Sequence, residues 1–220
     1  MNAEKQKILR RIREALGVHT VHTVHKVHPQ GDIASWLPKV GPAFEAWTEL
    51  FAKNSVQLKT SFHLVESEAA AARLLAETAR AEGWQRLAAH GNGPARAIVT
   101  TLGLPSLWTD GGYDARELER CDAGITECDA LVAQTGSVLV TSKSAGGRAL
   151  SVLPPHHVVL ARREQLVADL PAAFALLERK YRDAYPSFIG FITGPSRTGD
   201  IERILVLGAH GPKKLTIVCW

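Results

Sequence analysis

Long apolar runs are missing from this sequence of 220 residues, of which 45% are hydrophobic. A membrane-spanning helix needs about 18–20 consecutive apolar residues, and no stretch comes near that length. The first residues also lack the apolar segment and the small-residue cleavage site of a secretory signal. We therefore expect a soluble, cytoplasmic protein without a membrane span.

Cysteine is also scarce, because Cys121, Cys128 and Cys219 are the only ones in the chain. An odd number at these spacings matches neither a disulfide framework nor a CxxC site. Three thiols are also too few for the usual all-thiolate ligation of a [4Fe–4S] cluster. We expect reduced, mostly buried thiols, no metal site and no cofactor in this chain.

Common catalytic and nucleotide-binding motifs are absent as well: the sequence contains no Walker A loop, GxGxxG, GxSxG elbow or HExxH pair. The net charge of +4 comes largely from one segment, EKQKILRRIR, near the start of the chain. The sequence has no RNP aromatics and no zinc-finger spacing, so we expect no binding to nucleic acid.

The first forty residues differ in pattern from the rest. Residues 1–16 place Ile8, Leu9, Ile12 and Leu16 at helical spacing among basic residues, which predicts an amphipathic helix that packs on the domain or on a partner. The repeat VHTVHTVHKVHP follows, with histidines at positions 19, 22, 25 and 28. We interpret it as a low-complexity linker; the alternative is a weak, adventitious metal site on an extended chain. The predicted division is a helix and linker over 1–40 and an α/β domain over 41–220.

Strand and helix patterns alternate after residue 41. Helices are predicted over 42–53, 67–82, 92–103, 115–120, 169–182 and 198–207, and extended segments over 56–65, 86–90, 105–108, 188–193 and 214–220. Residues 124–163 form a β-rich section in which Gly, Ser and Pro separate the extended runs. This order predicts an α/β fold with three layers and a mainly parallel sheet.

The segment Gly194-Pro195-Ser196-Arg197-Thr198 lies between a predicted strand and a predicted helix. Such an order directs backbone N–H groups and a helix N-terminus at the carboxyl edge of a sheet, where an anion fits. Ser196 and Thr198 can cap the helix or bind an oxyanion, and Arg197 offers a bidentate fork for carboxylate or phosphate. A structural turn with a capped helix is an equally good interpretation.

A second polar stretch, TGSVLVTSKSAGGRA, supplies the hydroxyls of Thr135 and Ser137 and the guanidinium of Arg148. Small hydroxyls near an arginine suit an anion pocket, but Ser/Gly turns also occur wherever a hairpin needs them. His156 and His157 open a predicted strand, so their side chains must point to opposite faces. The candidate anion-binding residues are Ser196, Arg197, Thr198, Thr135, Ser137, Arg148 and His157. No triad is defined, so the catalytic residues stay unassigned.

Three segments in order, DAGITECDALVAQTGSVLV, LSVLPPHHVVL and FITGPSRTGDIERILVLGAHGPKKLTIV, together with ILRRIREALG at the start, resemble the lactate utilization protein C group of the LUD-domain family. The resemblance covers most of residues 84–220. It places the family pattern on Gly124, Thr126, Asp129, Thr135, Gly136, Pro155, His157, Gly194, Pro195, Ser196, Arg197, Thr198, Asp200, Glu202, His210 and Gly211. Two positions depart from the pattern: Gln134 replaces a common acid, and Glu127 replaces a small residue.

The resemblance implies a fold similar to the NagB/RpiA/CoA-transferase group and a role in oxidation of L-lactate to pyruvate. It further implies partner subunits that carry iron–sulfur clusters. On this basis we expect a non-cluster subunit that holds an anionic group, such as a small organic acid, at the GPSRT turn. The alternative is an independent transferase, isomerase or folate cyclo-ligase-like enzyme acting on a phosphorylated or CoA-linked substrate. A regulatory module that senses an organic acid is a third hypothesis. Whether the chain is itself an enzyme is open.

Overall fold

The computed structural model describes residues 3–17, 38–91, 93–199, 205–208 and 210–220. The chain divides into two units, Met1–Lys39 and Val40–Trp220. In the first, the predicted helix is confirmed as α1 (Ala3–Gly17), on which Ile8 and Leu9 are exposed. The histidine repeat lies outside the described residues. None of the described helices has both the length and the apolar content that crossing a membrane requires.

The second unit is built on a six-stranded sheet in which every neighbouring pair is parallel, as predicted from the alternation of strands and helices. Its strands, in spatial order, are β1 (Ser61–Leu64), β12 (Lys214–Cys219), β7 (His156–Ala161), β4 (Ala123–Glu127), β2 (Leu87–Ala89) and β3 (Ser106–Trp108). The central strands β7, β4 and β2 are buried on both faces, which explains their almost continuous apolar sequences.

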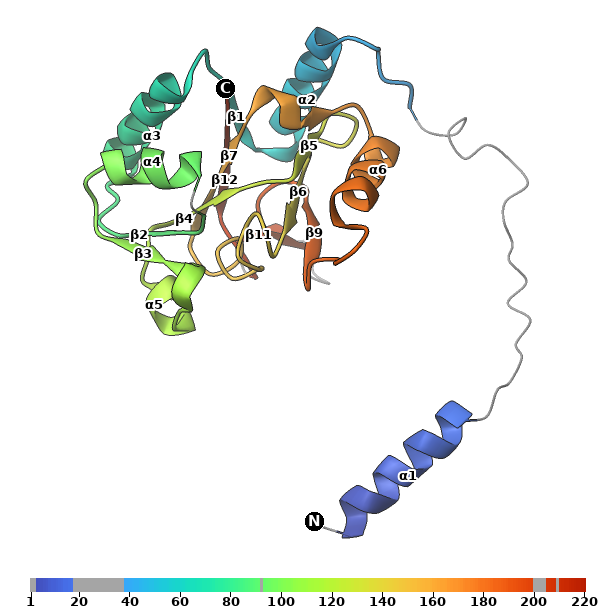
Figure 1. Cartoon of the computed structure of the whole chain (residues 1–220). Helices are drawn as coiled ribbons and strands as arrows, with labels where there is room; N and C mark the ends of the chain where they lie inside the picture. Colours follow the sequence, from blue (N-terminus) through green and yellow to red (C-terminus); the bar gives the residue numbers. More distant parts are fainter. Residues whose placement is uncertain (1–2, 18–37, 92, 200–204, 209) are drawn as a thin grey trace. The chain divides into compact units, whose positions relative to one another are not determined.

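Two helices cover one face of this sheet, α3 (Glu68–Glu82) and α4 (Pro94–Thr101) (Figure 1). Ser67 caps α3 by accepting the Ala70 N–H, and Gly83 ends it in the left-handed conformation. These ends agree with the helix predicted over 67–82. Leu75 and Ile98 are essentially fully buried between helices and sheet. Burial of such a side chain contributes about 1.5–3 kcal/mol to stability.

The other face carries α2 (Phe44–Leu58) and a second sheet rather than helices alone. The second sheet has the order β8 (Leu166–Val167), β5 (Ala130–Val132), β6 (Ser137–Thr141) and β9 (Ile189–Ile192). Helix α6 (Leu170–Tyr181) covers its far side (Figure 1). The remaining short helices are η2 (Thr109–Gly111), α5 (Ala115–Glu119) and η3 (Arg163–Gln165).

One predicted element was wrong, and another was wrong in its first residues. The helix over 198–207 is replaced by a hairpin in which β10 (Arg197–Gly199) pairs antiparallel with β11 (Leu205–Leu207). Gly199 disfavours a helix interior, and the β-branched residues Thr198 and Val206 face each other across the hairpin. The extended segment over 56–65 is helical up to Leu58, and the strand begins only at Ser61.

The strand before the GPSRT turn is confirmed as β9, but it pairs antiparallel with β6 in the second sheet. Gly194 therefore does not follow a strand of the parallel sheet. The predicted anion site required a strand of the parallel sheet before the turn and a helix after it, and the structure has neither.

Candidate functional site

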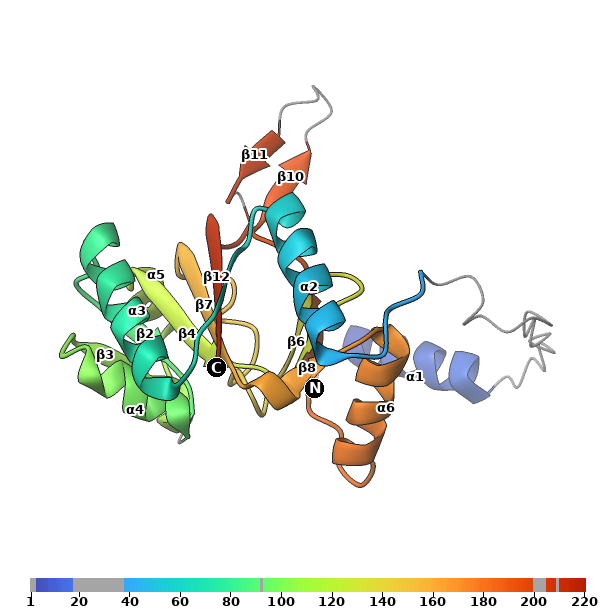
Figure 2. The same cartoon turned by 90° about the horizontal axis from the view of Figure 1, so that it is seen from above.

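Arg197, the central residue of the predicted anion site, points at the protein itself. Its guanidinium donates a hydrogen bond to the Leu58 carbonyl oxygen, at the C-terminal end of α2. Figure 2 shows β10 beside that end of the helix. The last carbonyls of a helix lack intrahelical donors and carry negative dipole charge, so a cation stabilises them. Arg197 thus has a structural partner in place of a ligand.

Thr135 and Ser137 lie where the connection from β5 to β6 packs against α2. Asn54 on α2 donates through Nδ2 to the carbonyls of Ala133 and Gln134, at 2.8 and 3.1 Å, and so fixes the β5–β6 turn. Ser137 shares a hydrogen bond with the Thr193 hydroxyl at 2.8 Å, and Thr135 has a buried hydroxyl without a described partner. Thr198 lies on β10, opposite Val206.

His157 lies in the middle of the fold, fully buried on β7. Its Nε2 is 2.9 Å from the Thr126 hydroxyl on β4, and burial lowers its pKa to about 3, so the ring is neutral. His156 faces the α3 side, as the alternation predicted, with its ring edge-on to Trp84 and Nε2 2.8 Å from the Thr216 hydroxyl. Burial lowers the pKa of His156 to about 4.

Arg148 reaches a pocket of about 640 Å³ at the amino-terminal ends of β7 and β12, which we call the amino-edge pocket. It is lined by Glu119, Arg148, Val152, Leu153, Pro155, Gly208, His210, Gly211 and Lys213. Arg148 and Lys213 outnumber the acid Glu119, and His210 adds an imidazole. The lining therefore combines two cations with apolar walls, a composition that suits a small carboxylate.

The GPSRT turn shapes this pocket through its backbone. Ser196 donates its N–H to the Pro212 carbonyl at 2.9 Å and accepts the Gly208 N–H at 3.0 Å. A Cβ on Gly211 would lie only 3.1 Å from the Ser196 Cβ, so the glycine lets the two segments touch. The two halves of the predicted signature thus form one unit that sets His210 and Lys213 beside Arg148. Of the predicted set, Arg148 lines this pocket directly and Ser196 supports its wall.

A second group, missed in the sequence, lies at the carboxyl ends of β2, β3 and β4. His90 Nδ1 is 3.0 Å from the Thr109 hydroxyl and 3.7 Å from the Asp110 carboxylate. Arg96 pairs with Asp110 at 3.3 Å and stacks 3.8 Å above the Trp108 ring. The segment HGNGPARA between a strand and a helix was the available signal, since ligands bind open parallel sheets at this edge where the connections diverge.

Glu127 closes the helix end in that group. Its Oε1 accepts the Ala95 N–H at 3.2 Å, and a Cβ on Gly93 would lie 3.0 Å from the same oxygen. The N-terminus of α4 therefore already has a carboxylate from its own chain. The group is internally paired and offers less unbalanced charge than the amino-edge pocket.

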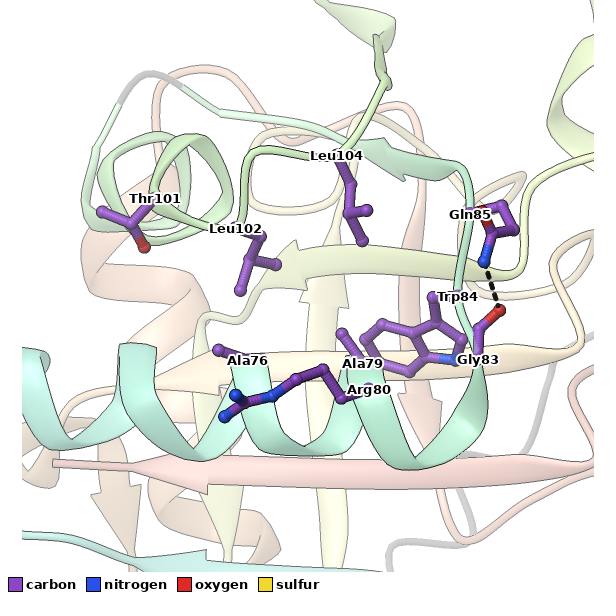
Figure 3. Close-up of a pocket in the computed structure, with 9 residues that line it drawn as sticks. All are labelled: Ala76, Ala79, Arg80, Gly83, Trp84, Gln85, Thr101, Leu102 and Leu104. Atoms are coloured by element: carbon purple, nitrogen blue, oxygen red, sulfur yellow. Dashed lines mark hydrogen bonds between the residues drawn. The ribbon is translucent and has the colours of Figure 1, made fainter.

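A further pocket of about 490 Å³ lies between the C-terminal end of α3 and the loop after α4. Figure 3 shows Trp84, Leu102 and Leu104 as its apolar wall, with Arg80 as its charged side chain. It contains no carboxylate or imidazole, so it lacks the groups of an acid–base site.

Residues 108–219, just over half of the chain, match the model of the LUD domain.

The chain belongs to the LUD domain family.

The match agrees with the resemblance seen in the sequence, and its range contains both Arg148 and the GPSRT and GAHGP segments. Three curated relatives named lactate utilization protein C illustrate it. The one from Deinococcus radiodurans is 30% identical over 136 residues, 57% of this chain and 63% of the relative. The one from Anoxybacillus flavithermus is 34% identical over 148 residues, 61% of this chain and 66% of the relative. The one from Shouchella clausii is 38% identical over 112 residues, 50% of this chain and 49% of the relative. The chain thus spans less than two thirds of the length of these relatives.

A solved structure supports the fold. The crystal structure of a DUF162 family protein from Deinococcus radiodurans superposes with a TM-score of 0.62, over 81% of this chain and 99% of the other, at 21% identity. At that identity the likeness concerns architecture alone. The relation to the NagB/RpiA/CoA-transferase group stays a prediction.

Proposed function

We propose that this LUD-domain chain acts in lactate utilization, as a non-cluster subunit that binds a small carboxylate in the amino-edge pocket. The observation that carries the proposal is the convergence of Arg148, His210 and Lys213 from distant segments on one pocket. The names of the relatives support a role in lactate utilization. The cations and apolar side chains of the pocket support binding of a 2-hydroxy acid such as lactate.

Arg148 is the best candidate to hold the carboxylate. Its guanidinium has no described ion-pair partner, and a planar fork binds a carboxylate through two parallel hydrogen bonds. Lys213 adds a second cation, and the His210 imidazole can exchange a hydrogen bond with a neighbouring hydroxyl. The apolar side chains of Val152 and Leu153 suit the methyl group of lactate.

Oxidation of L-lactate to pyruvate releases two electrons and two protons, and the electrons need an acceptor. The cysteines of this chain do not fit an iron–sulfur cluster, because all three are buried, with Cys121 in one core cluster and Cys128 and Cys219 in another. Burial also raises the pKa of Cys219 to about 11, which disfavours the thiolate that a metal needs. The proposal therefore assigns the electron acceptor to iron–sulfur partner subunits.

The decisive variant is Arg148→Ala, expressed in cells that lack the native chain and grow on L-lactate. We expect slow or no growth on lactate with normal growth on glucose, and a loss of L-lactate binding of tenfold or more by calorimetry, because a charged hydrogen bond contributes about 1.5–3 kcal/mol. Arg73→Ala is the control, since Arg73 is an exposed arginine of α3 without a described ion pair.

Normal lactate growth of a folded Arg148→Ala chain would contradict the proposed role of the pocket. Purification of the tagged chain under anaerobic conditions tests the partner assignment, with stoichiometric iron–sulfur subunits as the expected result. Turnover of a phosphorylated or CoA-linked substrate by the isolated chain would favour the independent enzyme instead.

A further inference from the structure

A separate pocket of about 320 Å³ lies on the α3 side of the parallel sheet, where β1 and β12 begin. Three of its lining residues are lysines, Lys59, Lys213 and Lys214, and Glu82 is its one acid. We call it the lysine pocket. Its positive charge is therefore in excess, and the hydroxyls of Ser61 and Thr78 add groups that hydrogen-bond to oxyanions.

One of the three lysines of the lysine pocket, Lys214, is paired with an acid of the chain, and the other two are not paired within the described residues. Lys214 Nζ is held by both oxygens of Glu82, at 2.7 and 2.6 Å, which fixes this ammonium on the pocket wall. Lys59 and Lys213 form no ion pair with any residue of the described ranges. Two ammonium groups are thus free to meet an anion, and like charges gathered in a concave site attract one.

Lys59 stands at a position that usually takes glycine. It is the C-cap of α2 with φ 58° and ψ 35°, and its N–H bonds the carbonyls of Ser55 and Val56. The left-handed conformation is unfavourable for a side chain with Cβ, and helices commonly end there on glycine. The helix dipole favours a cation anywhere in the last turn, but it does not require one at this residue. A lysine in this strained backbone conformation, with its side chain in a concave site, points to a use for the side chain.

We propose that the lysine pocket binds a phosphate group, either as free inorganic phosphate or as the end of a small metabolite. The ammonium groups of Lys59 and Lys213, unpaired among the described residues, match the charge of a phosphate dianion, and the hydroxyls of Ser61 and Thr78 can donate to its oxygens. Lys213 lines this pocket and the amino-edge pocket alike. The binding of phosphate nevertheless stands on the lysine pocket alone and does not depend on the proposed role in lactate utilization.

The test is calorimetric titration of the full chain at low ionic strength with inorganic phosphate and, separately, with glucose 6-phosphate. Lys59→Gly is the informative variant, because glycine suits the left-handed conformation and the protein should unfold at the same or a higher temperature. We expect this variant to bind phosphate about tenfold more weakly, the effect of losing one charge-assisted contact. Lys53→Ala, an exposed lysine of the same helix, should bind as the unaltered chain does.

Glu82→Gln adds a test of sign. Removal of the only acid of the pocket should strengthen phosphate binding several-fold, whereas loss of a merely structural ion pair would not. Tighter binding of glucose 6-phosphate than of inorganic phosphate would identify the ligand as part of a metabolite, and the reverse would identify the free ion. The proposal is overturned if neither ligand binds saturably, or if Lys59→Gly and Lys53→Ala bind alike. Arg148→Ala should retain phosphate binding, so this result is independent of the lactate experiment.

Discussion

Among the ion pairs of the described residues, Asp129 is the most completely buried partner, with no exposed side-chain surface. Lys180 Nζ and the Tyr181 hydroxyl both donate to its Oδ1, at 2.5 and 2.6 Å, and join the second sheet to α6. Burial disfavours the carboxylate, but the hydrogen bonds from Lys180 and Tyr181 outweigh burial and lower the Asp129 pKa. The buried acid of the family pattern therefore has a structural role in this chain.

Asp129→Asn should lower the free energy of unfolding by about 2–3 kcal/mol, below the usual 3–5 kcal/mol for a broken buried pair, because Lys180 is half exposed and can be solvated. Urea unfolding measures the change, and Asp183→Asn, at an exposed acid after α6, is the control with little expected effect. Because the pKa of Asp129 is lowered in the fold, its contribution is complete above the ordinary carboxyl pKa and is lost as the pH falls below it. A variant whose stability differs from the native protein equally at neutral and strongly acidic pH would contradict this account.

Residue chemistry was easier to predict than residue partners. The sequence predicted that Arg197 binds a carboxylate or phosphate, whereas its guanidinium donates to the backbone oxygen of Leu58, 139 positions away in the chain. Glu127 was noted as a departure from the family pattern, yet its partner, the N-terminus of α4, lies 32 residues earlier. Such pairings depend on which elements become neighbours, and that information is not local.

At the scale of elements, the segment that follows β6 crosses the face of the parallel sheet. A Cβ on Gly146 would lie 2.5 Å from the His90 ring, and the Leu150 carbonyl lies 2.3 Å from where a Cβ on Gly124 would be. Pro155 then reaches the amino end of β7. This segment carries Arg148, so its close approach to β4 positions one wall of the amino-edge pocket.

Gly124→Ala should therefore lower the free energy of unfolding by about 3 kcal/mol, at the upper end of the range for overpacked cores, because backbone rather than a flexible side chain must yield. The same change should weaken ligand binding at Arg148. Thermal unfolding with Gly111→Ala as control provides the measurement, since a Cβ at Gly111 meets nothing within 4 Å. Equal unfolding temperatures for the two variants would show that the crossing segment can move away without loss.

Local signals decided which elements were predicted correctly. Helices α3 and α6 are capped by Ser67 and Asp169, whose side chains accept N–H groups of the first turn, and Gly83 is the C-cap of α3. The β10–β11 hairpin has no such signal, because Ser196 and Thr198 looked like helix caps. The segment pairs as an antiparallel hairpin in place of the predicted helix. The anion site predicted at the N-terminus of that helix is therefore absent from the described residues.

At the scale of the molecule, alternation of strands and helices predicted the parallel sheet, but the second sheet was foreseen only as a β-rich stretch. Its strands β6 and β9 pair across about fifty residues that include β7 of the other sheet. The pattern of residues within one segment does not indicate which distant strand it pairs with. The amino-edge pocket depends on the same long-range assembly. This explains why the sequence supplied Arg148 as a candidate and His210 only as a position of the family pattern, and did not join them in one site.

The division into two units leads to the last prediction, for a chain shortened to residues 40–220. Every buried core residue of the described ranges lies in Val40–Trp220, so this unit contains a hydrophobic core of its own. The shortened chain should therefore unfold within about 2 °C of the full chain, which corresponds to less than about 1 kcal/mol at this size. Differential scanning calorimetry checks this, and a clearly lower temperature would mean that α1 packs on its own domain.

If the shortened chain folds normally but no longer supports growth on lactate, the apolar face of α1 binds a partner. Normal growth of a full chain in which Ile8 and Leu9 are both changed to serine would contradict that role.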